Sequence, residues 1–207
     1  MKNVIFDWSG TLVDDLPPVL EATNRIFAHY RREAMDREEF RRTFKLPFAE
    51  FYEEVLPGVL MEDLDRLYIE FFASSEATVS ILPEAVEVLD YCRSTGRRIF
   101  LLSSIHRDHY EQQSEALGLD RYFEVAYAQV LDKKQKIHEI LEVHELDPGE
   151  TMFVGDMVHD IETAKHGGVF SVATLTGYDP PERLAAAGPD LTVSDLAGLK
   201  KYLQTPA

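Results

Sequence analysis

The chain has very little cysteine and no long apolar run. Cys92 is the only cysteine among 207 residues, so no disulfide can form within the chain, which favours a reducing compartment. No apolar stretch approaches the roughly 20 residues that a membrane-spanning helix needs. The short apolar run at the start, Val4–Phe6, is followed directly by an acid and does not resemble a signal peptide. We therefore expect a cytoplasmic protein with no membrane partner.

Positive charge is also scarce. There are 21 Lys and Arg residues against 37 Asp and Glu, which gives a formal net charge of −16 at pH 7. A broad cationic surface, which nucleic-acid binding requires, is therefore excluded, and anionic lipid headgroups would be repelled. Hydrophobic residues make up 45% of the chain, which is enough for a buried core. A small anionic substrate remains possible only where local positive charge overcomes the repulsion.

After Pro83, short apolar runs alternate with amphipathic segments. The runs typical of strands are Val4–Phe6 at the start of the chain and, after Pro83, Arg98–Leu102, Phe123–Ala128, Thr151–Val154 and Phe170–Ala173. The segments typical of helices are Pro83–Arg93, Arg107–Leu117, Lys136–His144, Asp160–His166, Pro181–Ala187 and Leu196–Tyr202. Strands that alternate with helices indicate a parallel sheet covered on both faces. We predict an α/β core with a Rossmann-like, three-layer architecture.

The segment between the first two strands has a different character. From Leu16 to about Ser75 it is charged, amphipathic and rich in aromatic residues at helical spacing, and it contains no run typical of a strand. Pro47 and Pro57-Gly58 divide it into several helices. We therefore predict that residues 1–14 and 80–207 form the α/β core and that residues 15–79 form an inserted, all-helical domain.

Polar residues stand where three of the expected strands end. Asp7, Ser103 and Asp156 each follow an apolar run directly. In parallel α/β sheets the ligand site lies beyond the carboxyl ends of the strands, so these side chains should converge. A carboxylate placed there, such as Asp7, can attack phosphorus as a nucleophile, and Gly10 would let backbone N–H groups approach an anion.

Further charged residues suit a phosphate site. Lys134, with Lys133 and Lys136 beside it, would supply positive charge ahead of a helix. Asp156 and Asp160 are spaced four residues apart, and together with Asp7 they would repel one another unless a cation lay among them. Hard oxygen ligands without a requirement for Cys or His indicate Mg²⁺ rather than Zn²⁺.

This set of motifs resembles the haloacid dehalogenase superfamily, especially its phosphoglycolate-phosphatase-like branch. The resemblance rests on the stretch from Phe6 to Asp14, on Leu101-Leu102-Ser103-Ser104, on the lysine run, and on Val154-Gly155-Asp156 through Asp160. It spans essentially the whole chain, including a helical insertion at the position where this branch carries its cap domain. It implies a phosphatase that acts on a small phosphorylated metabolite.

The resemblance also implies a role for each matching residue. Asp7 would form an aspartyl-phosphate, and Lys134, with Lys136 as second choice, would orient Asp7 and neutralise the phosphoryl group. The residues that would contact the phosphoryl group are Gly10, Thr11, Ser103, Ser104 and Lys134. Mg²⁺ would be held by Asp7, the backbone carbonyl of Ser9 and Asp156, with support from Asp160. Arg41 and Lys45, in the inserted domain, are candidates for contact with the substrate.

Ser9 is the departure from the family pattern. Family phosphatases usually carry a second aspartate two residues after the nucleophile, where it acts as general acid and base, a function worth roughly 10²–10⁴-fold in rate. A serine hydroxyl is a poor substitute, so a phosphatase restricted to good leaving groups is expected. A cap residue such as Glu21 or His29, the substrate or bulk water would have to replace the base.

Two other functions stay open at this point. One is a phosphonatase-like hydrolase of C–P bonds, whose family has Asp-Trp-Ala-Gly-Thr where this chain has Asp-Trp-Ser-Gly-Thr, and which needs a cap lysine such as Lys45 for a Schiff base. The other is a binding or scaffold protein for a phosphorylated ligand, with little or no turnover. The sequence leaves the physiological substrate and the choice between monomer and homodimer undecided.

Overall fold

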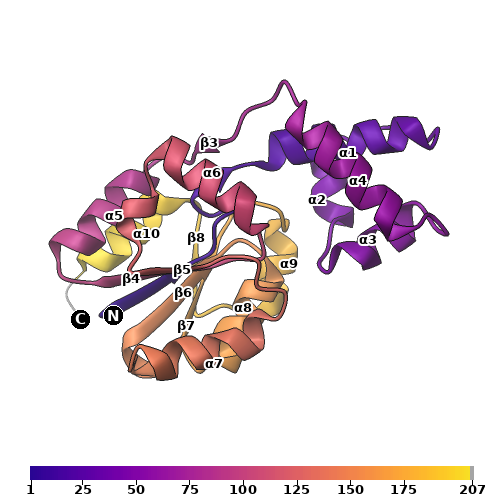
Figure 1. The fold of residues 1–207 in the computed structure, drawn as a ribbon. Helices are drawn as coiled ribbons and strands as arrows, with labels where there is room; N and C mark the ends of the chain where they lie inside the picture. Colours follow the sequence, from indigo (N-terminus) through magenta and orange to yellow (C-terminus); the bar gives the residue numbers. More distant parts are fainter. Residues whose placement is uncertain (206–207) are drawn as a thin grey trace. The chain divides into compact units, whose positions relative to one another are not determined.

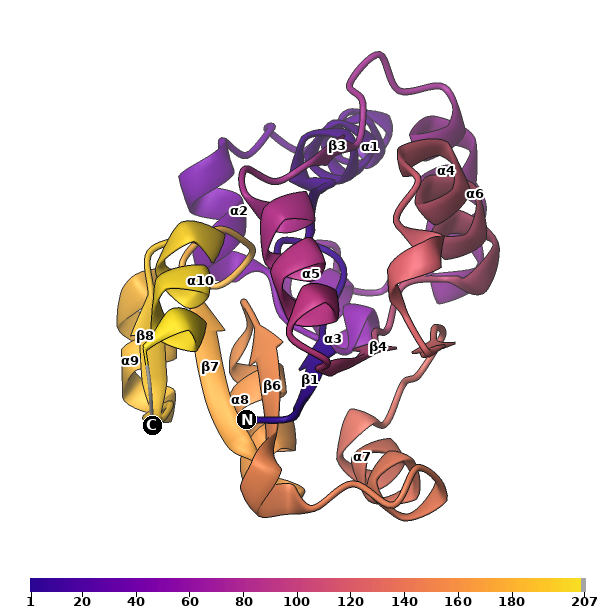
Figure 2. The same cartoon turned by 90° about the vertical axis from the view of Figure 1, so that its left-hand side faces the viewer.

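Six parallel strands form the central sheet of the protein, for which a computed structural model describes residues 1–205. Across the sheet the order is β5-β4-β1-β6-β7-β8, and Figure 2 shows β4, β1, β6, β7 and β8 in this order from right to left. The strands are β1 (Asn3–Phe6), β4 (Arg98–Leu102), β5 (Val125–Tyr127), β6 (Thr151–Gly155), β7 (Phe170–Thr174) and β8 (Leu191–Val193). The central strands β1 and β6 are buried along their whole length, as is usual where helices cover both faces.

Helices cover both faces of this sheet (Figure 1). On one face lie α5 (Ala85–Ser94), α6 (Arg107–Leu117) and α10 (Leu196–Gln204), and on the other α7 (Lys133–Val143), α8 (Val158–His166) and α9 (Pro181–Ala187). Ile137 and Ile140 of α7 belong to the same buried cluster as Ile5 and Phe100 of the sheet. The predicted three-layer α/β fold is therefore confirmed.

The chain divides into two compact units. One consists of Met1–Asp14 with the chain from Ser80 onward, and the other is Asp15–Val79. The second unit contains α1 (Leu16–His29), α2 (Arg37–Thr43), α3 (Phe48–Val55) and α4 (Met61–Ala73). Its aromatic residues form a core of their own, in which Phe40 stacks on Phe44 at 4.9 Å and meets Phe51 edge-on at 5.7 Å.

A two-stranded antiparallel ribbon lies at the division between the units. It pairs β2 (Val13–Asp14) with β3 (Ser80–Ile81), so that Asp14 stands opposite Ser80. Neither strand was expected from the sequence, and neither was β8. The first two contain two residues each and β8 is only partly buried, so none of them forms an apolar run long enough to be recognised.

The start of α7 differs from the prediction in a way that matters for the site. The sequence pattern predicts a helix from Lys136, whereas α7 begins at Lys133. Asp132 caps it, because its Oδ1 accepts a hydrogen bond from the backbone N–H of Gln135 at 3.0 Å. An aspartate followed three residues later by Gln is a recognised helix-start pattern. The lysine run therefore forms the first turn of the helix and does not precede it.

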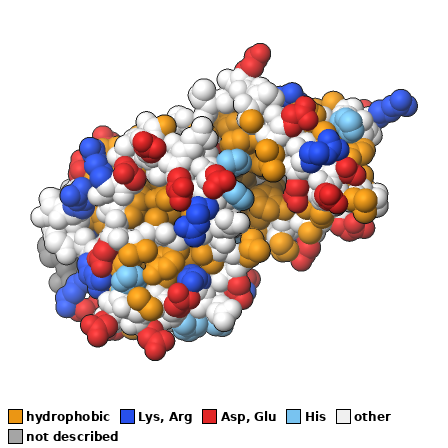
Figure 3. All heavy atoms as spheres, in the orientation of Figure 1, with side chains coloured by type: hydrophobic (Ala, Val, Ile, Leu, Met, Phe, Trp, Pro, Cys, Tyr) orange, Lys and Arg blue, Asp and Glu red, His pale blue; other side chains and the backbone are white. Residues whose placement is uncertain are grey.

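The surface reflects the small number of Lys and Arg residues in the sequence. On the face shown in Figure 3, Lys and Arg side chains lie among acidic and apolar ones and form no broad patch. Within residues 1–205, no helix has both the length and the apolar character needed to cross a bilayer.

Candidate active site

The side chains that follow three adjacent strands meet at one edge of the sheet. β1 pairs with β4 on one side and with β6 on the other, so Asp7, Ser103 and Asp156 leave neighbouring strands at the same end. All three side chains are buried, as is Asp160 in the first turn of α8. One carboxylate oxygen from each of Asp7, Asp156 and Asp160 lies within 4.8 Å of the other two. The expected convergence at the strand ends is present in the structure.

A buried lysine bridges two of these acids, and it is Lys133. Its Nζ lies 2.8 Å from Asp7 Oδ1 and 2.7 Å from Asp160 Oδ1, and only 3% of the side chain is exposed. Side chains on a helix lean toward its N-terminus, so the first residue of α7 points toward the strand ends. Lys133 is therefore the cation of this site.

The prediction of Lys134, with Lys136 as second choice, is wrong in its placement. Lys134 is 41% exposed and pairs with Glu162 of α8 at 2.9 Å, while Lys136 pairs with Glu139 one turn further along α7 at 2.6 Å. The error follows from the misplaced start of the helix. With α7 beginning at Lys133, these two residues turn away from the strand ends.

Asp156 is held by a close approach of two loops. Its Oδ1 accepts a hydrogen bond from Thr11 Oγ1 at 2.7 Å, and its Oδ2 accepts one from the backbone N–H of Tyr178 at 2.8 Å. A Cβ atom at Gly177 would lie 1.9 Å from Oδ2, and one at Gly10, where φ is +71°, would lie 2.5 Å from it. Only glycine fits at these two positions.

Gly10 and Thr11 were expected to contact the phosphoryl group, and the structure gives them another role. The backbone N–H of Gly10 donates to Val13 at 2.8 Å, and that of Thr11 donates to Trp8 at 3.2 Å. The Thr11 side chain is fully buried against Asp156. Because these donors are used inside the tight turn, both residues position Asp156 and do not present a donor to an anion.

The serines lie beside Asp7. The Ser103 hydroxyl hydrogen-bonds to the Asp7 carboxylate, and its oxygen also accepts from the N–H of Ile105 at 3.3 Å. Ser104 follows it in the same loop and is half-buried. Ser9 is half-buried in the turn after Asp7, where it forms an isolated bridge with Val13. The loop that carries Ser103 and Ser104 and the turn that carries Ser9 therefore both lie next to Asp7.

Burial and mutual repulsion control the charge of the cluster. Burial raises the pKa of Asp7, and the Lys133 ammonium opposes that rise. Burial, together with the charges of Asp7 and Asp160, raises the pKa of Asp156 well above its usual range. For Lys133, burial favours the neutral form, but the two carboxylates outweigh it, so the pKa is raised and the ammonium persists.

This charge balance fits a divalent cation. Three carboxylates face one ammonium, so the deprotonated cluster has an excess of negative charge in a buried place. Hard cations with oxygen ligands are the ions that such a donor set binds. Asp7, Asp156 and Asp160 are the side chains that would hold the ion.

A loop after β7 contributes residues to the site that the sequence motifs do not predict. Besides Gly177 and Tyr178, it provides Asp179, whose Oδ2 accepts from the backbone N–H of Val158 at 2.7 Å and so fixes the start of α8. Thr176 Oγ1 donates to the carbonyl of Gly10 at 2.7 Å. The Gly-Tyr-Asp run that follows a buried strand is the sequence feature that could have indicated this loop. It was missed because Gly177 and Tyr178 act through the backbone, and because the side-chain contacts of Thr176 and Asp179 depend on the tertiary structure.

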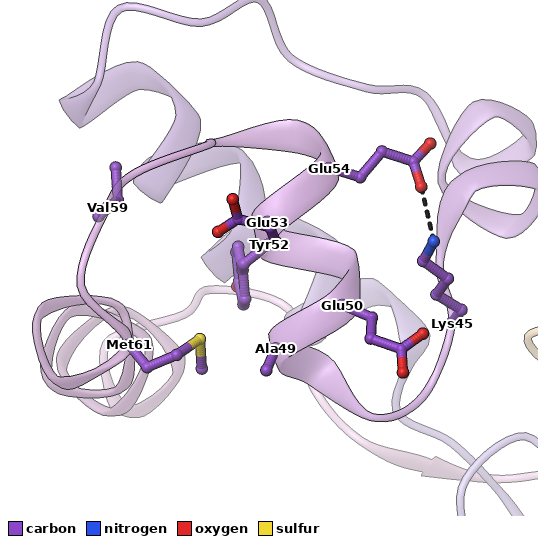
Figure 4. Close-up of a pocket in the computed structure, with 8 residues that line it drawn as sticks. All are labelled: Lys45, Ala49, Glu50, Tyr52, Glu53, Glu54, Val59 and Met61. Carbon is purple, nitrogen blue, oxygen red and sulfur yellow. Dashed lines mark hydrogen bonds and ion pairs between the residues drawn. The ribbon is translucent and has the colours of Figure 1, made fainter.

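In the helical unit, Lys45 lies at a hollow of about 580 Å³ on the surface of α3 (Figure 4). Glu50, Glu53 and Glu54 line the same hollow. Lys45 Nζ pairs with Glu54 Oε2 at 2.7 Å, so its charge is offset locally. Carboxylates around the hollow would repel a phosphate group, so this setting disfavours Lys45 as an anion ligand.

Two other candidates in the helical unit have local partners. Arg41 lies 3.7 Å from Glu38 on the same helix, α2. Glu21, considered as a substitute base, accepts hydrogen bonds from Ser75 Oγ at 2.7 Å and from the N–H of Ala77 at 3.2 Å, and these bonds lower its pKa. Such a carboxylate stabilises the end of α4 and its following loop, so its contacts are structural.

Known phosphatases and hydrolases resemble this chain in sequence and in fold. A phosphoglycolate phosphatase from Synechococcus elongatus is 27% identical over 203 residues, which cover 95% of each chain. Phosphoglycolate phosphatase 1 from Pseudomonas aeruginosa is 24% identical, covering 96% of this chain and 78% of that protein. A haloacid dehalogenase-like hydrolase from Streptococcus pneumoniae has the same fold, with a TM-score of 0.87 at 19% identity over 99% of both chains.

The family match covers most of the chain and includes the acidic residues of the site. The model of the haloacid dehalogenase-like hydrolases matches residues 4–174. That range contains Asp7, Lys133, Asp156 and Asp160, which the structure brings together. The chain therefore belongs to the haloacid dehalogenase-like hydrolase family, as a phosphatase-type enzyme similar to phosphoglycolate phosphatases.

Proposed function

We propose that this protein is a Mg²⁺-dependent phosphatase that transfers the phosphoryl group of a small metabolite to Asp7 and then to water. The observation that supports it best is the buried cluster of Asp7, Asp156 and Asp160, bridged by Lys133. Mg²⁺, held by these carboxylates and the backbone carbonyl of Ser9, would supply positive charge that offsets the repulsion between phosphate and the acidic site. Since relatives are named phosphoglycolate phosphatases, a phosphorylated hydroxy acid is the first substrate class to test.

The steps assigned to the chain itself are few. A carboxylate oxygen of Asp7 attacks phosphorus, the bond from phosphorus to the leaving oxygen breaks, and an aspartyl-phosphate forms. Water then attacks that phosphorus, which releases inorganic phosphate and restores the carboxylate. Lys133 orients Asp7 and offsets its negative charge, and Ser103 donates a hydrogen bond to the same carboxylate. Catalysis of this kind depends mainly on positioning and charge.

Ser9 restricts the substrates that can be turned over. Without an aspartate at this position, no side chain adjacent to Asp7 in sequence can protonate the departing oxygen or activate water. We therefore expect acyl and aryl phosphates, whose leaving groups need no proton, to be hydrolysed faster than alkyl phosphates. The aspartyl-phosphate should also persist, because general base catalysis of its hydrolysis, worth roughly 10²–10⁴-fold, is lost.

A substrate panel with two variants tests this proposal. With Mg²⁺ present, wild type should hydrolyse acetyl phosphate and 4-nitrophenyl phosphate, and Asp7→Asn should abolish turnover. Ser9→Asp should raise the rate on 2-phosphoglycolate by about 10²-fold or more, while changing the rate on acetyl phosphate much less. An inert wild type whose Ser9→Asp variant is also inert would refute the phosphatase proposal.

The two alternatives have less support. A C–P hydrolase needs a cap lysine available for a Schiff base, whereas Lys45 is engaged by Glu54. A pure binding protein would have no use for a buried nucleophile, an adjoining lysine and three clustered acids. We expect substrate selectivity to reside in the inserted helical unit, which we propose serves as a cap domain.

A further inference from the structure

Two histidines face each other across α7 and α8, outside the carboxylate cluster. His138 Nε2 lies 2.8 Å from His166 Nδ1, and their rings are 4.8 Å apart at an interplanar angle of 68°. Both side chains are exposed to solvent. The proposed phosphoryl transfer uses neither of them, so the pair is available for another role.

The backbone of the two helices brings these rings together. A Cβ atom at Gly167 would lie only 2.9 Å from Cδ1 of Ile137, so the helices approach closely beside the pair. One turn earlier on each helix, Lys134 and Glu162 form an ion pair at 2.9 Å. This ion pair offsets the positive charge of Lys134, one turn from His138.

The geometry suits a metal ion that prefers nitrogen ligands. In the present contact one imidazole donates a hydrogen bond and the other accepts it, so at least one ring is neutral. Two nitrogens bound at about 2.0–2.1 Å to a tetrahedral ion would be roughly 3.4 Å apart. The rings therefore need to separate by only about 0.6 Å, which small side-chain rotations provide.

We propose that His138 and His166 form a second metal site, specific for a divalent transition ion such as Zn²⁺ or Ni²⁺. Imidazole suits these ions, whereas Mg²⁺ prefers carboxylate and carbonyl oxygens, so the two sites of the protein differ in the ion they select. Because the ligands are exposed, water completes the coordination shell. The site does not depend on phosphatase activity.

A bound ion would link the two helices that contribute Lys133 and Asp160. Lys133 is the first residue of α7, and Asp160 lies in the first turn of α8. An ion that binds only the folded protein stabilises it by mass action. Zn²⁺ at this site should therefore raise the melting temperature without contact with the carboxylate cluster.

Calorimetric titration of the protein tests the proposal. Wild type is titrated with Zn²⁺ in the presence of millimolar Mg²⁺, which competes for the carboxylate site. We expect one Zn²⁺ bound per chain, and an affinity at least about tenfold lower in His138→Gln and in His166→Gln, equivalent to about 1.4 kcal/mol. His29→Gln, which removes an exposed histidine of the helical unit, is the matched control and should bind like wild type.

Two further measurements separate the sites. Asp156→Asn, which impairs the carboxylate cluster, should retain the Zn²⁺ affinity of wild type, and the Zn²⁺-dependent rise in melting temperature should vanish in His138→Gln. The activity with Mg²⁺ alone should be unchanged in both histidine variants, which also shows that they are folded. Zn²⁺ binding that is absent in wild type, or equally strong in both histidine variants, would overturn the proposal.

Discussion

At the scale of single residues, two adjacent lysines have opposite environments. Lys133 is buried between Asp7 and Asp160, whereas Lys134 is exposed and pairs with Glu162. Removal of the buried ammonium leaves two buried carboxylates without their partner, and loss of such a group at a reacting centre typically costs about 10²–10³-fold in rate.

Lys133→Met should therefore reduce kcat/KM for acetyl phosphate by about 10²-fold or more, whereas Lys134→Met should stay within about twofold of wild type. Steady-state kinetics of the two variants, with circular dichroism to check folding, makes the comparison. If Lys134→Met proved the more damaging variant, the assignment of the motif lysine to Lys133 would be incorrect.

At the scale of helices and strands, the start of α7 determines where its first lysine points. Asp132 caps α7 by accepting from Gln135, and Asp195 caps α10 in the same way by accepting from Gly198 at 2.9 Å. Loss of either cap should cost about 0.5–2 kcal/mol of stability. Only the cap of α7 adjoins the carboxylate cluster.

Asp132→Ala and Asp195→Ala form a matched pair. Both should lower the free energy of unfolding by a similar amount in urea denaturation, but only Asp132→Ala should lower kcat, because a frayed first turn releases Lys133. Equal activity in the two variants would show that the position of Lys133 does not depend on the helix cap.

The elements that a sequence reveals here are those with a continuous apolar run. β1, β4 and β6 are such runs, and since their ends are recognisable, Asp7, Ser103 and Asp156 could be predicted to converge. The lysine could not be identified in the same way, because a shift of three residues in the start of α7 changes which side chain faces inward. The Gly177 loop was missed because its contribution is close backbone approach, which depends on tertiary structure.

At the scale of the whole molecule, an acidic chain concentrates three buried carboxylates at one point. Because the folded-state pKa of Asp156 is raised above its ordinary value of 3.8, stability without a cation should fall as pH rises through that folded-state pKa. A divalent cation competes with the proton and should restore stability where the carboxylates are ionised.

Mg²⁺ should therefore raise the melting temperature more at pH 8 than at pH 5. At a concentration of 100 times Kd the gain is about 2.7 kcal/mol, or roughly 5–10 °C for a chain of this size. Differential scanning calorimetry with Mg²⁺ and with EDTA measures the effect, and Asp156→Asn should lose most of it. A shift of equal size at both pH values would argue that the ion binds elsewhere.

The ribbon of β2 and β3 is the point at which the helical unit could be exchanged. Asp14 and Ser80 stand opposite each other in antiparallel register, so the chain departs from the α/β unit and returns to it at adjacent points. Two such strands are the ends of a hairpin that a two-residue Asn-Gly turn can close. The helical unit is thus a replaceable module, and the α/β unit could accept a different one, or none, through the same two-strand junction.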